Sequence, residues 1–194
     1  MKATEVGYVR GLGDVSGSQK DGKMAQVLEL LAQSKIRTIG LVVDKVDKIM
    51  HGMELGTAGM HNQIKQWGKQ GFMLNLFNLL FDRGFEIYLS SDHGNVEAMG
   101  CGRPTEGAVA DLRGERVRIY SDPVLMKRVK NKFVNSIEWP PIGLPEKYYA
   151  LIADGRYAFT QKNRSIVCHG GISMEEVLVP FVKITRENSK KCKK

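Results

Sequence analysis

The chain has 194 residues, of which 42% are hydrophobic and 26% are charged, and its formal net charge is +8. This balance is ordinary for a globular domain with a real core, and it excludes disorder as the default state. No apolar run approaches the roughly 20 residues of a membrane span, and no signal-peptide core opens the sequence. We therefore expect a cytoplasmic protein with no membrane association.

The charge and the cysteines narrow the function classes further. Residues 188–194 carry four lysines and no acid, so subtracting them from +8 leaves +4 for the rest of the chain. We interpret 187–194 as a solvated basic tail; the remaining excess would suit an anionic substrate or a nucleic acid without requiring either. Cys101, Cys168 and Cys192 show no CxxC spacing, so neither a zinc knuckle nor a disulfide framework is predicted.

The first part of the chain predicts a loop followed by an α/β unit. Residues 1–22 are polar and rich in glycine, with no clear period, and we interpret them as a flexible loop or lid. A phosphate-binding loop is not favoured there, because we see no preceding strand and no GKS or GKT. From Met24 the apolar residues recur at helical spacing as far as about Ser34, and a buried strand then covers Ile36 to Val43.

The middle of the chain predicts a long helix and a strand that ends in polar residues. The glycine-rich segment 52–59 is interpreted as the entry to a helix, with a loop closing over a site as the alternative. Residues 62–82 have a broad apolar face typical of one amphipathic helix, which Gly84 ends. Residues 85–90 alternate as in a strand, which runs into Asp92-His93-Gly94.

The last third predicts further strands around an irregular segment. Residues 97–108 are interpreted as a loop and 115–120 as a half-exposed strand. Residues 121–155 include a short basic helix and three prolines in WPPIGLP, so we interpret them as an insertion or cap over the site.

Residues 156–160 and 164–168 are interpreted as paired strands that lead to His169. The pattern S-x-x-E from Ser173 to Glu176 then predicts a helix start, because it matches a capping box. Residues 177–184 are interpreted as a last strand, which Pro180 restricts to an edge or a bulge.

Three of the four histidines follow predicted strands. His51, His93 and His169 each lie beyond an apolar stretch, and the carboxylates Asp47 and Asp92 lie beside two of them. The carboxyl ends of strands in open α/β sheets form the crevice where ligands bind. If these strands are neighbours, the five side chains supply the nitrogen and oxygen ligands of a zinc or manganese site. His61 lies outside this set, and we interpret it as structural or as a substrate contact.

Taken together, D-x-x-x-H, D-H-G and a late H-G-G resemble the metal-binding core of the alkaline phosphatase superfamily. The segments IMHGMELGTAGMHNQ (49–63), SSDHGN (90–95), RGERVRIY (113–120) and CHGGISMEEVLVPFV (168–182) resemble the PglZ-domain family of bacterial phage-resistance systems. The resemblance covers about residues 36 to 185. It implies an α/β fold with an alkaline-phosphatase-like sheet flanked by helices.

The resemblance also implies a metal-dependent hydrolase acting on a phosphate ester or phosphodiester. Asp47, His51 and His169 would bind one divalent ion, and Asp92 and His93 would help to bind a second. Zinc is the expected metal, with manganese as the alternative. The expected partners are a phosphorylated or nucleic-acid-like anionic substrate and subunits of a phage-defence complex.

One part of the superfamily pattern has no match. The second metal site is normally completed by an aspartate and a serine or threonine nucleophile after the first strand. We assign this role to none of the candidates in 1–22, which are Asp14, Ser16, Ser18 and Asp21. We therefore expect 23–186 to be the C-terminal portion of the domain, with N-terminal strands missing, an incomplete second metal site and little or no turnover.

Two other functions remain open from the sequence. The chain could be a non-catalytic interaction module that keeps the metal for stability. It could also bind nucleic acid through its basic residues, although it lacks a stripe of alternating aromatic and basic residues.

Overall fold

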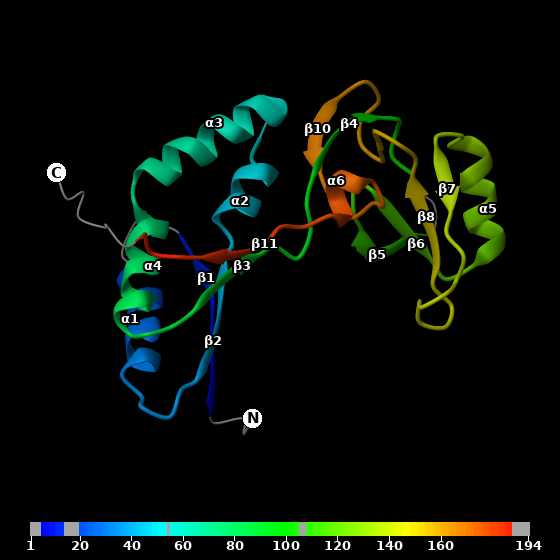
Figure 1. Ribbon diagram of the computed structural model, residues 1–194. Helices are drawn as coiled ribbons and strands as arrows, with labels where there is room; N and C mark the ends of the chain where they lie inside the picture. The colour runs from blue at the N-terminus through cyan, green and yellow to red at the C-terminus, as the bar shows by residue number, and fades with distance from the viewer. Residues whose placement is uncertain (1–4, 14–19, 54, 105–107, 188–194) are drawn as a thin grey trace. The chain divides into compact units, whose positions relative to one another are not determined.

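The computed structural model describes residues 5–13, 20–53, 55–104 and 108–187 (Figure 1). Its contacts divide the chain into two compact units. Unit 1 consists of Met1–Gly52, His61–Tyr88 and Lys183–Lys194, and unit 2 consists of Met53–Met60 and Leu89–Val182. Both contain helices and strands, as the α/β prediction requires. None of the helices in the described ranges is long and apolar enough to cross a bilayer.

Unit 1 is built on two parallel strands and the helices that follow them. Its elements are β1 (Val6–Leu12), α1 (Lys20–Leu31), β2 (Thr38–Val43), α2 (Lys45–His51), most of α3 (Gly56–Lys69), α4 (Phe72–Asp82), the start of β3 (Ile87–Ser90) and the end of β11 (Phe181–Ile184). β1 pairs with β2 in parallel, and β11 pairs with β3. The core lies where α1 and α4 meet the strands, with Val27, Leu76 and Leu80 among its buried residues.

Three expectations for unit 1 are wrong. Residues 6–12 are not a loop: they form β1, in which Val9 and Leu12 are buried. The helix predicted over 62–82 is two helices, because Gly71 has a φ of 78°, in the left-handed region that ends a helix. The helix and the strand predicted over 24–43 are confirmed as α1 and β2, but no residue of β2 is fully buried, so the expectation of a buried strand is wrong.

Unit 2 contains two small sheets. Its elements are β4 (Val96–Gly100), β5 (Ala108–Arg113), β6 (Val117–Tyr120), α5 (Pro123–Lys132), β7 (Ser136–Glu138), β8 (Tyr149–Ala153), β9 (Tyr157–Ala158), β10 (Ser165–Cys168) and α6 (Met174–Val177). One sheet has the order β10-β4-β9, with β10 antiparallel and β9 parallel to β4. The other has the order β5-β6-β8-β7, and α5 packs on it.

The structure also corrects the predictions for unit 2. The polar stretch 97–108 was expected to be a loop, yet its first four residues lie in β4, the central strand of its sheet. The strands of 156–160 and 164–168 do not pair with each other, because β4 lies between them. The segment 121–155 contributes β7 and β8 to a sheet. Leu151 on β8 is fully buried, so this segment helps to form the core. Its role as a cap stays a prediction.

Candidate metal centre

Asp47 and His51 lie one turn apart on α2, directly after β2. Their spacing of four residues places them on one helix face, and Oδ1 of Asp47 lies 3.5 Å from Nε2 of His51. Both side chains are about half exposed, at 46% and 54%. This face of unit 1 therefore carries one carboxylate and one imidazole, which are two common ligand types for zinc.

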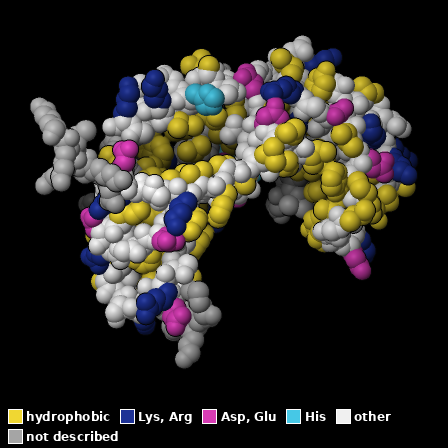
Figure 2. Space-filling model, in the orientation of Figure 1, with side chains coloured by type: hydrophobic (Ala, Val, Ile, Leu, Met, Phe, Trp, Pro, Cys, Tyr) yellow, Lys and Arg dark blue, Asp and Glu magenta, His cyan; other side chains and the backbone are white. Residues whose placement is uncertain are grey.

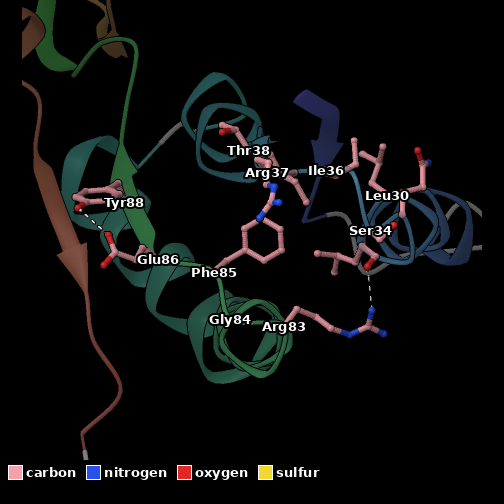
Figure 3. A pocket seen from close by; sticks show the side chains of 13 residues that line it. Leu30, Ser34, Ile36, Arg37, Thr38, Arg83, Gly84, Phe85, Glu86 and Tyr88 are labelled. Carbon is pink, nitrogen blue, oxygen red and sulfur yellow. Dashed lines mark hydrogen bonds between the residues drawn. The ribbon is translucent and has the colours of Figure 1, made fainter. Parts of the chain in front are cut away.

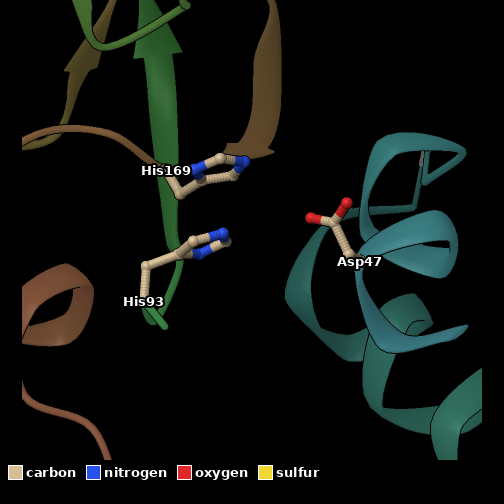
Figure 4. A group of neighbouring side chains, drawn as sticks. All are labelled: Asp47, His93 and His169. Atoms are coloured by element: carbon tan, nitrogen blue, oxygen red, sulfur yellow. The ribbon is translucent and has the colours of Figure 1, made fainter. Parts of the chain in front are cut away.

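His93 and His169 are brought together by the pairing of β4 with β10. Val96 lies opposite Cys168, so the residues before β4 and after β10 meet at the same end of the sheet. The two imidazole rings stack with centroids 3.8 Å apart and planes 11° apart (Figure 4). A ring nitrogen of one histidine lies within 4.8 Å of a ring nitrogen of the other. The sequence prediction that these two histidines converge is therefore correct.

One hydrogen bond fixes which nitrogen of His93 can bind a metal ion. Nδ1 of His93 lies 3.0 Å from the carbonyl oxygen of Gly94. A carbonyl only accepts hydrogen bonds, so we assign the proton to Nδ1, which leaves the lone pair of Nε2 for a ligand. Metal-binding histidines are commonly oriented by such a bond from their second nitrogen.

Asp92 lies next to the histidine pair but is not enclosed by it. Its side chain is 91% exposed, and its Oδ1 lies 3.7 Å from Nε2 of His93. Oδ1 also accepts a hydrogen bond of 3.2 Å from the backbone N–H of His93. Unit 2 therefore holds two imidazoles and one exposed carboxylate within a single surface region. The remaining histidine, His61, is exposed on α3.

Comparison with known families decides the relationship of the chain. The family model described as the BREX system PglZ alkaline phosphatase-like domain matches residues 17–184. The chain belongs to the PglZ family. No curated protein matches it. The resemblance stated from the motifs is therefore confirmed, and the mixed α/β architecture of both units is consistent with an alkaline-phosphatase-like domain.

In this PglZ domain, a buried ion pair holds the turn that follows His169. Arg116 on the approach to β6 and Glu176 on α6 are 1% and 2% exposed. Their two bonds, Nε–Oε1 and Nη2–Oε2, measure 2.9 and 3.0 Å. The guanidinium also donates to the carbonyl oxygens of Tyr157 and Gly155, the second at 2.8 Å. Such a bidentate fork between planar groups fixes orientation as well as distance.

Glu176 connects this ion pair to both histidine loops of the PglZ domain. Its carboxylate accepts hydrogen bonds from the backbone N–H of Gly171 at 2.8 Å and of Ser173 at 3.1 Å. Its carbonyl oxygen accepts one from the N–H of Gly94 at 2.8 Å. The capping box predicted at Ser173 is confirmed. Because His93 precedes Gly94 and His169 precedes this turn, Glu176 ties the two loops together.

Burial by itself would raise the pKa of Glu176. This effect is outweighed, and the pKa is lowered. The causes that lower it are the side-chain bond from Arg116, the bonds from Gly171 and Ser173, and the charge of Arg116. Glu176 is therefore ionised in the folded PglZ domain at neutral pH. Sequence reasoning identified Glu176 as a helix cap but missed Arg116, whose alternating context R-V-R predicted an exposed side chain.

A second long-range contact fixes the start of α3. Glu97 on β4 accepts a hydrogen bond of 3.1 Å from the backbone N–H of Thr57 and another of 3.0 Å from the hydroxyl of Ser165. The bond from Thr57 is the main cause that lowers the pKa of Glu97. These contacts favour the helix-entry interpretation of 52–59 over a substrate-contacting role for Thr57. Glu54, the other candidate contact there, lies outside the described residues.

The nucleophile of the PglZ domain is not assigned. The sequence predicts no buried strand leading into Asp14, Ser16 and Ser18, which is one reason why none of them is assigned as the nucleophile. β1 removes that reason, since it ends at Leu12 with its core side chains buried. The candidates at 14–18 themselves lie outside the described residues.

Proposed function

We propose that this PglZ domain contributes the metal-binding half of a phosphoesterase core that cleaves a phosphate ester or phosphodiester in phage defence. Asp47, His51 and His169 hold one divalent ion in this proposal, and Asp92 and His93 help to hold a second. Zinc is the proposed metal and manganese the alternative. The nucleophile is assigned to none of the described residues, and we expect the chain to bind metal with little turnover.

The observation that carries the proposal is the stacked pair of His93 and His169. Two imidazoles from loops 76 positions apart in the sequence share one surface region, and the bond from Nδ1 to Gly94 prepares His93 to donate through Nε2. His93 is one third exposed, so the pair is accessible from the surface. The donor set of imidazole and carboxylate fits zinc or manganese.

In the proposed reaction the residues of this chain bind and orient. Asp47, His51 and His169, and Asp92 with His93, would hold the divalent ions, which would supply positive charge to the oxygens of a phosphoryl group during its displacement. The carboxylates of Asp47 and Asp92 neutralise part of the cationic charge. The ion pair of Arg116 and Glu176 keeps the loop of His169 in one conformation, as precise placement of a ligand requires.

The test is a metal titration with a matched histidine control. Wild type, His169→Ala, His51→Ala and His61→Ala are purified without metal, and zinc affinity is measured by isothermal titration with metal content checked by mass spectrometry. We expect His169→Ala and His51→Ala to bind zinc at least about tenfold more weakly, because each removes a direct ligand. His61→Ala should bind as wild type does, since His61 is exposed outside both ligand sets. Equal affinity of all four proteins refutes the assignment.

Two alternatives predict different results. An interaction module that keeps the metal for stability predicts the same loss of zinc affinity, with no hydrolysis of bis(p-nitrophenyl) phosphate even by the complete protein. A nucleic-acid-binding domain predicts DNA affinity that falls steeply with salt and persists when 188–194 are removed. The histidine pair favours metal binding over nucleic-acid binding, because two neighbouring imidazoles are typical ligands of a metal ion.

A further inference from the structure

The connection between β7 and β8 is longer than a hairpin needs. The two strands pair antiparallel, with Glu138 opposite Leu151. β7 ends at Glu138 and β8 begins at Tyr149, so residues 139–148 form a loop of ten residues. Hairpin loops commonly have about two to five residues. Figure 1 shows the loop extending beyond the ends of both strands, so its length serves a purpose other than the pairing of β7 with β8.

The loop carries apolar side chains that belong to no core. Its sequence is WPPIGLPEKY, and Pro140, Pro141 and Pro145 are all exposed. Ile142 is 81% exposed, more than any other large hydrophobic residue in the described part of the chain. Figure 2 shows hydrophobic side chains gathered over this part of unit 2. A group of exposed apolar side chains is typical of an interaction site.

The prolines restrict the backbone of the loop before any partner binds. Pro140 and Pro141 fix their φ angles at about −65°. Trp139 and Pro140 each precede a proline, which disfavours helical backbone at both positions. The run 139–141 is therefore held close to the polyproline II conformation.

Both ends of the loop are fastened as well. The N–H of Trp139 donates to the carbonyl oxygen of Ala150 at 2.9 Å, and the N–H of Tyr148 donates to that of Pro145 at 3.2 Å. In the turn that the second bond closes, Lys147 has a φ of 63°, in the left-handed region that residues other than glycine rarely adopt. A loop already held in one conformation loses little entropy when it binds.

The chemistry of the loop defines what fits it. Pro140 and Pro141 have carbonyl oxygens but no N–H, so a partner strand cannot pair with this run in a ladder. The charged residues of the loop, Glu146 and Lys147, have opposite signs, so the loop does not attract a nucleic acid by charge. A matching surface must cover the proline rings with apolar faces and donate hydrogen bonds to the carbonyl oxygens. Tyrosine and tryptophan side chains do both.

We propose that the loop 139–148 is a docking site for another protein of the same defence system, whose groove is lined by tyrosine and tryptophan side chains. The groove receives the rings of Pro140 and Pro141 and the side chain of Ile142. Membership of a family that belongs to a multi-protein defence system supports a protein partner. The inference does not depend on the metal centre.

A second copy of this chain is the competing partner. A cavity of about 750 Å³ in unit 1 has the aromatic rings of Phe85 and Tyr88 in its lining (Figure 3). The same lining includes Arg37, Arg83 and Glu86. An apolar loop placed there would take charged side chains out of water, which costs free energy. The second copy therefore fits less well than an aromatic groove.

Photocrosslinking from the loop tests the partner. Ile142 is replaced by the photoreactive residue p-benzoylphenylalanine in the full chain, which is expressed with the other proteins encoded by its defence system and irradiated. The control places the same residue at Val134, which is 75% exposed and lies before β7, at the other end of the hairpin. We expect one crosslinked protein, from position 142 only, attached close to tyrosine or tryptophan residues. A crosslink to a second copy, equal yields from both positions or no product overturns the proposal.

The affinity of the purified partner tests the role of the prolines. Isothermal titration compares wild type with the double variant Pro140→Ala and Pro141→Ala, with Ile142→Ser and with the control Glu146→Gln. The double variant should bind at least about tenfold more weakly and Ile142→Ser at least about fivefold, because both remove apolar contacts with the groove. Glu146→Gln should change affinity less than about twofold, since its exposed side chain lies outside the proline run. Urea unfolding checks that each variant is folded, and equal affinity of wild type, the double variant and Ile142→Ser overturns the proposal.

Discussion

Replacing Glu176 by glutamine tests whether one buried ion pair stabilises the turn that follows His169. The substitution keeps the shape of the side chain but leaves the guanidinium of Arg116 without an opposing charge in a place where it is 1% exposed. The bonds of 2.9 and 3.0 Å to the carboxylate become at most one bond, from the guanidinium to the amide oxygen of glutamine. The carbonyl oxygens of Gly155 and Tyr157 still accept from the guanidinium.

The magnitude follows from this geometry. Removing one partner of a buried ion pair costs about 3–5 kcal/mol, and the two remaining carbonyl acceptors place Glu176→Gln near the lower end, at about 3 kcal/mol. For a chain of this size that corresponds to a fall in Tm of about 6–12 °C. Urea and thermal unfolding followed by circular dichroism measure both. The matched control is Glu175→Gln, because Glu175 forms an exposed ion pair with Arg156 at 2.5 Å and this substitution should lower stability far less than Glu176→Gln.

The pH dependence gives a second, independent check. The folded pKa of Glu176 is lowered from 4.5, so the carboxylate stabilises the fold above its unfolded pKa and loses this contribution as the pH falls through the folded pKa. The difference in stability between wild type and Glu176→Gln should therefore be full at pH 7 and shrink below pH 4.5. Equal stability of Glu176→Gln and Glu175→Gln at pH 7, or a difference that does not change into acid, refutes the reasoning.

Three further predictions use the same stability measurements or simple labelling. Gly94→Ala would place a Cβ 1.9 Å from a backbone oxygen and should lower stability by at least about 2 kcal/mol. Gly68→Ala on α3, where a Cβ meets nothing within 4 Å, should raise stability by up to about 1 kcal/mol. Similar effects at both sites contradict the close packing at Gly94. Burial raises the pKa of Cys168 to about 12. Iodoacetamide at pH 8 should therefore alkylate Cys168 at least about 100-fold faster in urea than in the folded chain. Equal rates in the two states contradict the burial of this thiol. The bond from Thr57 lowers the pKa of Glu97. Wild type should therefore lose stability as the pH falls through the folded pKa of Glu97, and Glu97→Gln should lose less. Wild-type and Glu97→Gln urea midpoints that change identically across pH 4 to 7 would disprove this.

The fold was predictable where the buried face is made of large apolar side chains. The helix from Met24 and the strand that follows it satisfy this condition, and both are found. β1 does not, because Gly7 occupies a buried position against the side chain of Leu30, where a Cβ would come within 2.9 Å. The exposed face of β1 instead carries Tyr8, which is 63% exposed. With a glycine at an inward position and a tyrosine at an outward one, the alternation gives only a weak signal of a strand.

The candidate metal residues were predictable because each follows an apolar run in the sequence. The arrangement that orients them was not, because it depends on contacts between residues about 60 positions apart. The sequence around Arg116 predicts an exposed cation next to a half-buried strand. Glu176 comes to lie beside Arg116 only when the chain folds. Glu176 itself carried a local signal, the capping box, which explains one helix start but gives no reason to expect an ion pair.

The register of β4 on β10 links the core to the histidine pair. Val96 and Ala98 face the core, and Glu97 between them faces the hydroxyl of Ser165 and the start of α3. If the pairing of β4 with β10 shifted by one residue, the side chain of Glu97 would point into the core and the apolar side chains would point outward. The register is therefore strongly specified. The same register places the residue after Cys168 opposite the loop that precedes Val96. The stacking of His93 on His169 is therefore a consequence of core packing.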